Sequence, residues 1–147
     1  MRLNEMVAKK SGLPEGFGGE RAKWDEVKVR FTIRKICVLQ RPARDKETGE
    51  IITYQDGPRR GEPIPDRQVI MTVETEDKKL LLIRTNSRRI TSLYAGDLDR
   101  KPDAQNQFGD DVFIVEAPEG WLRFVPFKQE YANGQKGDVA DLMEAEE

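Results

Sequence analysis

The chain has 147 residues, 37% of them apolar and 35% charged, with a net charge of −2, a length sufficient for one domain with a real core. It has no histidine and one cysteine, Cys37, which excludes histidine-dependent catalysis, histidine- or thiolate-bound zinc and an internal disulfide. It has no apolar run of 18 residues and no apolar signal core in MRLNEMVAKKSGL. We therefore expect a cytoplasmic, non-enzymatic protein without cofactor, metal or membrane contact.

Charge is unevenly distributed along the chain. Residues 27–60 contain nine Lys or Arg and four Asp or Glu, whereas residues 138–147 contain five acids and no base. This separation points to a polyanion-binding body with an acidic tail that competes for the basic surface or recruits protein partners. A solvated strand face and an ordinary disordered terminus would explain the same pattern.

Residues 1–23 are predicted to form an N-terminal arm. A short helix fits residues 4–10, whereas residues 11–19 (SGLPEGFGG) contain four glycines and a proline and should not hold regular structure. Leu13 and Phe17 are the side chains expected to dock the arm on the domain.

The first predicted strand covers residues 26–40, within the stretch WDEVKVRFTIRKICVLQ. Apolar and cationic residues alternate up to Ile33, and the apolar positions then shift from odd to even numbers, at Ile36 and Val38. One extra residue near Arg34 restores the apolar face, which is what a β-bulge does. A long, bent first strand with one basic face is typical of small closed β-barrels.

A long excursion follows at residues 41–66, rich in proline and glycine. Its middle, residues 50–55, is β-prone, so we expect a hairpin or β-finger with flexible flanks. Loops longer than about 12–15 residues are uncommon unless they are functional.

The remaining sequence predicts four more strands and one helix. The strands are expected at residues 68–75, 80–85, 111–116 and 121–127, and a short helix at residues 86–96. After residue 129 the chain is expected to be a polar, then acidic, tail.

This order of elements resembles the OB-fold, a five-stranded Greek-key barrel with a helix between strands three and four. The resemblance implies an all-β barrel at residues 24–128, with a β-finger in the first loop, an N-terminal arm (1–23) and an acidic tail (129–147). In that fold the face of strands two and three, with the loops joining strands one–two and four–five, binds oligonucleotides or oligosaccharides.

A second resemblance is local. KLLLIRTNSRRITSLYAGDLD followed by FGDDVFIVEAPEGWLRFVP is similar to a pattern in small phage-encoded, OB-like proteins, over about a third of the chain. The matching positions are Asn86, Leu93, Gly96, Asp97, Gly109 and Arg123. Those proteins often carry a Trp and a Gly-Lys pair before the fourth strand, where this chain has Phe108, Gly109 and Asp110. The resemblance implies a single-stranded DNA-binding protein of phage or mobile-element type.

The candidate binding residues are cations for phosphates and exposed aromatics for bases, because base–aromatic stacking supplies roughly 1–3 kcal/mol per base. The cations are Lys28, Arg30, Arg34, Arg41, Arg44, Lys46, Arg59, Arg60 and Arg123, and the aromatics are Tyr54 and Trp121. Each also has an ordinary explanation, as a solvated strand face, a soluble loop or rim packing. Acids interleave with the loop cations, at Asp45, Glu47, Glu50 and Asp56.

Five aspartates near the helix offer oxygen ligands for Ca²⁺ or Mg²⁺, but without the spacing of an EF-hand, so we predict no metal site. They are Asp97, Asp99, Asp103, Asp110 and Asp111.

The sequence thus predicts a single-stranded DNA-binding protein of replication or recombination, with the oligomeric state left open. The main alternative is an assembly subunit of a virion or larger complex that uses its arms and β-finger. A carboxylate hydrolase ranks last.

Overall fold

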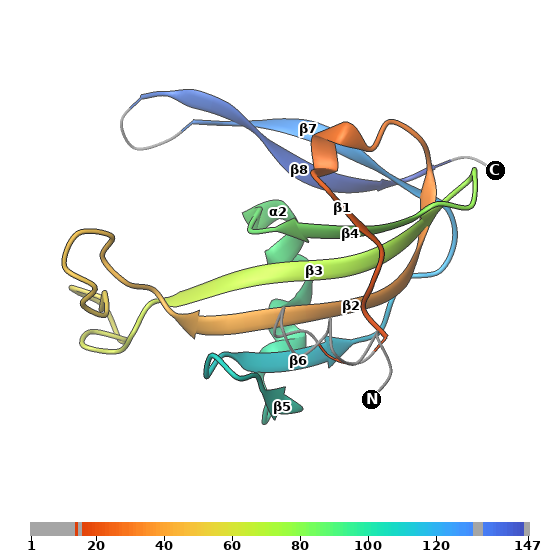
Figure 1. Cartoon of the computed structure of the whole chain (residues 1–147). Coiled ribbons are helices and arrows are strands. Elements are labelled where there is room, and N and C mark those ends of the chain that lie inside the picture. The colour runs from red at the N-terminus through yellow and green to blue at the C-terminus, as the bar shows by residue number, and fades with distance from the viewer. Residues whose placement is uncertain (1–13, 15, 131–133, 146–147) are drawn as a thin grey trace.

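The computed structural model describes residue 14, residues 16–130 and residues 134–145, and Figure 1 shows its architecture. The chain is mostly β-structure with one short α-helix, which confirms the predicted all-β class and the helix after the strand at residues 80–85. The strands are β1 (Glu20–Ala22), β2 (Phe31–Pro42), β3 (Pro65–Thr75), β4 (Leu80–Thr85), β5 (Ala104–Gln105), β6 (Asp111–Val115), β7 (Leu122–Glu130) and β8 (Lys136–Glu144). The helical segments are η1 (Trp24–Glu26), α2 (Arg88–Thr91) and η2 (Ser92–Leu98).

The described part contains eight strands in an open sheet, so the expectation of a closed five-stranded barrel is wrong. The sheet order is β1-β4-β3-β2-β6-β5. β7 pairs with β2 only through Phe31 and Leu122, and then pairs along its length with β8. The β7–β8 hairpin therefore leaves the sheet instead of closing it, and α2 contacts both β3 and β8. The contacts of α2 with β3 and β8 stand in place of the strand pairing that would close a barrel.

The predicted bulge is present in β2. Ile33 pairs with Val73 and Lys35 with Thr72, which leaves Arg34 as the extra residue. Ile33 and Ile36 consequently reach the same apolar cluster despite their odd and even numbers. The predicted start of this strand is wrong, because η1 and a short connection precede Phe31.

The sheet packs apolar side chains on both faces. Ile36, Val38 and Met71 belong to the main core, whereas Cys37 and Ile70 belong to a smaller cluster on the opposite face. This alternation follows the period of two along β2 and β3.

The arm crosses the second face. Phe17 is buried in the smaller cluster, as expected, and Gly18 exchanges hydrogen bonds with the Thr72 hydroxyl. The end of the arm, beyond the glycine-rich stretch, is regular, because β1 pairs in parallel with β4. Gly19 permits this approach: its φ is +115°, and a Cβ there would lie 2.9 Å from the Leu80 backbone. Leu13 and the predicted helix at residues 4–10 lie outside the described residues.

The described C-terminal residues form a strand, so the predicted tail is wrong over Lys136–Glu144. Ala140 is buried in the main core, and the buried Ser87 hydroxyl donates a 2.6 Å hydrogen bond to its carbonyl oxygen. The Asp141 carboxylate accepts a 3.0 Å hydrogen bond from Arg89. A small residue at the contact and a paired acid allow this acidic segment to pack.

The excursion forms a compact finger (residues 43–64) that projects from the ends of β2 and β3 (Figure 1). Isolated bridges join Arg44 with Ile51 and Thr53 with Pro63. The predicted β-finger is therefore present, although it contains bridges and turns instead of a regular hairpin. Among the described residues, no helix has the length and apolarity needed to cross a membrane.

Candidate nucleic-acid interface

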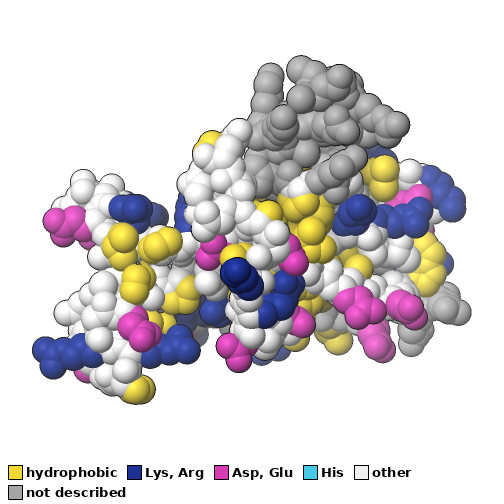
Figure 2. Space-filling model, turned by 90° about the horizontal axis from the view of Figure 1, so that it is seen from below, with side chains coloured by type: hydrophobic (Ala, Val, Ile, Leu, Met, Phe, Trp, Pro, Cys, Tyr) yellow, Lys and Arg dark blue, Asp and Glu magenta, His cyan; other side chains and the backbone are white. Residues whose placement is uncertain are grey.

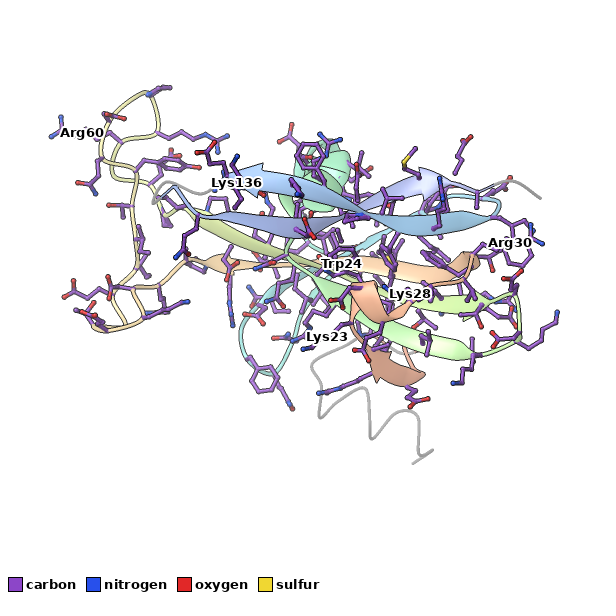
Figure 3. The ribbon with its side chains drawn as sticks, turned by 90° about the horizontal axis from the view of Figure 1, so that it is seen from above. Lys23, Trp24, Lys28, Arg30, Arg60 and Lys136 are labelled. Atoms are coloured by element: carbon purple, nitrogen blue, oxygen red, sulfur yellow. The ribbon has the colours of Figure 1, made fainter. Side chains whose placement is uncertain are left out.

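Apart from Arg34, the extra residue of the β2 bulge, the predicted binding residues fall into two groups at opposite ends of the sheet. One group lies on the finger or at its base and comprises Arg41, Arg44, Lys46, Tyr54, Arg59 and Arg60. The other comprises Lys28, Arg30, Trp121 and Arg123. The two are separated by β2, whose twelve residues span roughly 36 Å at about 3.3 Å per residue. Figure 3 shows Arg60 and Arg30 at the two ends. The structure does not bring the full predicted set onto one surface.

Three members of the second group, Lys28, Arg30 and Arg123, line a groove beside β7. The connection at residues 24–30 forms one wall and residues 123–126 of β7 form the other, with Asp138 of β8 at its margin. This space, the β7 groove, has a volume of about 560 Å³. It exists because β7 pairs with β2 only at Leu122 and then diverges. The local strand divergence thus creates a hollow next to predicted phosphate ligands.

Three cations line the β7 groove. Lys28 and Arg123 are exposed, and neither forms an ion pair within the described part of the chain. Arg30 is half-buried; its Nε lies 3.1 Å from the Glu76 carboxylate, and its guanidinium lies 4.5 Å from the centre of the Trp121 ring. Two acids, Asp25 and Asp138, also line the groove. Because Arg30 is already paired with Glu76, Lys28 and Arg123 are the two groove cations without a described ion pair, and they face two acids.

Trp121 is placed differently from the prediction. Arg30 lies over its ring at cation–π distance, so one face of the indole is already occupied. The groove instead offers Trp24, together with Phe124 and Pro126. Trp24 was not among the candidate residues identified from the sequence. The sequence did contain an indication of this position, because Trp24 is an aromatic residue with Lys23 and Lys28 within four positions.

Three of the other predicted cations already interact with protein groups. Arg34 pairs with Glu74 at 2.7 Å and Arg41 with Asp66 at 3.3 Å, while Arg44 donates a hydrogen bond to the Gly49 carbonyl. These pairs are largely exposed, and such pairs contribute little to stability. They nevertheless compete with a phosphate for the same guanidinium groups.

The finger carries three more exposed cations, Lys46, Arg59 and Arg60, which form no ion pair among the described residues. Asp45 precedes Lys46 in the chain, and hydrogen bonds from the backbone N–H groups of Thr48 and Glu47 hold the pKa of its carboxyl below the ordinary value. This acid therefore stays ionised and reduces the positive charge of the finger. Tyr54 is half-exposed there.

The described residues of the lower face of the molecule form no uniform basic patch. Figure 2 shows described cations and acids interspersed over this side. The outer face of β3 and β4, which corresponds to the expected OB ligand face, is partly covered by Phe17 and Gly18. The β7 groove is the place where the predicted cations and an apolar wall coincide.

Three of the five aspartates near the helix, Asp103, Asp110 and Asp111, accept hydrogen bonds from neighbouring side chains. Arg100 donates two 3.0 Å hydrogen bonds to Asp103, and the Asp103 pKa is lowered mainly by Arg100. Asp110 accepts a hydrogen bond from the Asn106 side chain. Among the described residues, no three acidic or cysteine side chains come together as a metal site.

Comparison with known proteins gives no relative for this chain. No protein family, curated protein or solved structure shows significant similarity to it.

Proposed function

We propose that this protein binds single-stranded DNA without catalysing a reaction, in phage or mobile-element DNA replication or recombination. The observation that carries the proposal is the β7 groove, where the exposed cations Lys28 and Arg123 line the same hollow as the apolar residues Trp24, Phe124 and Pro126. Cations contact phosphates irrespective of sequence. An aromatic and apolar wall suits bases that are not paired to a second strand.

The order of the strands supports an OB-like relationship. β2, β3 and β4 form an antiparallel meander, α2 follows, and β6 then pairs with the opposite edge of β2. This is the element order of an OB-fold up to its fourth strand. The β7–β8 hairpin stands where a fifth strand would close the barrel, and its divergence opens the groove.

The test is fluorescence anisotropy with a labelled oligothymidylate over a range of salt concentrations. Removal of one cation that binds a phosphate should reduce the slope of log affinity against log salt by about 0.7 for a single strand. We expect Lys28→Gln with Arg123→Gln to reduce the slope by about 1.4. The matched control is Arg88→Gln with Lys101→Gln, which removes two exposed cations that do not line the groove.

Two results would contradict the proposal: no binding by the wild-type protein at low salt, or binding without a salt slope. Equal slopes for the two double variants would leave DNA binding intact but exclude the β7 groove as its site. Thermal unfolding of each variant controls for loss of structure.

An assembly role is the second candidate, and the finger favours it. The finger projects from the sheet and exposes 42% of Ile51 and 40% of Ile52, next to Arg59 and Arg60. Light scattering distinguishes the roles. Assembly would be favoured by a discrete multimer whose size does not change when DNA is added. This multimer should dissociate when Arg59→Glu and Arg60→Glu are introduced together.

A further inference from the structure

A second hollow lies on the other side of η1. Residues 21–26, from the end of β1 through η1, form one wall, and the outer side chains of β3 and β4 form the floor. This β1 pocket has a volume of about 480 Å³, within the roughly 300–1,000 Å³ of small-ligand sites. It opens because β1 stays paired with β4 only to Ala22, after which η1 turns away from the sheet.

The pocket combines an apolar floor with a cationic rim. Ile70 and Leu82 form the floor, and the rim carries the exposed cations Arg21, Lys23 and Arg84. None of these three cations forms an ion pair with another described residue. Buried or half-buried apolar surface beside unneutralised cations is complementary to a flat organic ring that carries a negative charge.

The acids of this pocket do not cancel its rim. Asp25 and Glu26 line the same wall, but the Glu26 carboxylate is engaged at 2.9 Å by the backbone N–H of Lys23. The Glu26 carboxylate keeps its charge in this hydrogen bond, so three cations face two acids and the lining carries one net positive charge. The balance favours an anionic occupant.

Trp24 joins this pocket to the β7 groove. It lines both hollows, as does Asp25, and its half-buried side chain packs against the main core. Figure 3 shows Lys23, Trp24 and Lys28 along η1 and its connection, between the β7–β8 hairpin and β4. A ligand that leaves the β7 groove past Trp24 enters the β1 pocket directly.

We propose that the β1 pocket binds one nucleotide of the DNA strand held in the β7 groove, with the base against Leu82 and Trp24 and the phosphates on Arg21, Lys23 and Arg84. This inference rests on the proposed function and extends its site across η1. The basic rim comes mainly from β1 and η1, which lie outside the five-strand pattern expected from the sequence. The strand thus crosses η1 instead of following β2 towards the finger.

The test compares Arg21→Gln with Arg84→Gln against the matched control Arg88→Gln with Lys101→Gln. Anisotropy with labelled oligothymidylate is measured across salt concentrations, and thermal unfolding verifies that both variants fold. We expect the salt slope of the pocket variant to fall by about 1.4, since two cations that bind phosphates are removed, and the control to keep the wild-type slope. A pocket variant with the wild-type slope would overturn the inference.

Tryptophan fluorescence gives a readout that needs no change in the pocket. The chain has two tryptophans, Trp24 and Trp121, so Trp121→Phe leaves Trp24 as the reporter. We expect saturating oligothymidylate to quench this fluorescence. Absence of quenching while the oligonucleotide is bound would overturn the inference and would also exclude the β7 groove as the site, because Trp24 lines both hollows, but it would leave DNA binding itself standing. Failure of the wild-type protein to bind DNA at low salt would overturn both.

Discussion

At the scale of single residues, the cations of this protein differ in how available they are. Arg30 is held between Glu76 and the Trp121 ring, and Arg34 is paired with Glu74. Lys28 and Arg123 have no such ion pairs within the described residues. A count of basic residues therefore overstates the phosphate-binding capacity, and Lys28 and Arg123 should contribute more to the salt dependence than Arg30 or Arg34.

Cys37 gives a prediction that is independent of DNA. Its side chain is fully buried on β2, between β3 and β6, and this desolvation raises the pKa of the thiol from 9.0 to about 12. The thiolate is the reactive form. We expect no reaction with a disulfide reagent at pH 8 in the native protein and one equivalent of reaction in denaturant.

The same shift sets the sign of a pH effect. The unfolded thiol ionises near 9.0 and the folded thiol near 12, so the native state loses stability as the pH rises from 9 towards 12. Rapid labelling of native Cys37 at pH 8 would show that the sheet around it opens readily, contrary to the packing described.

Some residue assignments could be made from sequence and others could not. Phe31 and Phe113 lie within predicted strands and are buried, and the ring of Phe124 packs 4.8 Å from that of Phe31. These positions follow from alternation within a strand. The role of Trp24 could not be inferred in this way, because its two hollows are formed by β4 on one side and β7 on the other.

At the scale of elements, local patterns were informative where strands pair with sequence neighbours. The change of apolar phase around Arg34 located the bulge in β2, and the strand at Leu80–Thr85 was predicted with its observed bounds. β8 was missed because its core contact is the small residue Ala140, whose carbonyl bonds to Ser87 more than fifty residues earlier. The order of residues within this acidic segment does not indicate a contact with a residue so far away in the sequence.

The Ser87 hydrogen bond tests whether β8 is part of the fold. Ser87→Ala leaves the Ala140 carbonyl without this donor, and we expect a loss of about 1–3 kcal/mol in the free energy of unfolding, measured by urea denaturation. The matched control is Ser92→Ala at an exposed side chain, with a change within about 0.5 kcal/mol. Equal, negligible effects of both substitutions would indicate that the C-terminal segment does not pack on α2.

At the scale of the whole molecule, the open sheet determines where a ligand can lie. The β7–β8 hairpin diverges from β2 and creates the β7 groove, whereas the arm covers part of the face that an OB-fold would use. The finger lies at the far end of the sheet (Figure 3). The basic character of the first strand and its loop could be predicted from the sequence. The distance between the two groups of cations could not, because it depends on the length and direction of β2.

The most direct test of the proposed site is a map of backbone amide chemical shifts by NMR during titration with oligothymidylate. We expect the largest changes at residues 21–30 and 122–126, which border the two hollows beside η1, and small changes in the finger at residues 43–64. Changes confined to the finger, or no changes at a low salt concentration, would contradict binding of single-stranded DNA across η1.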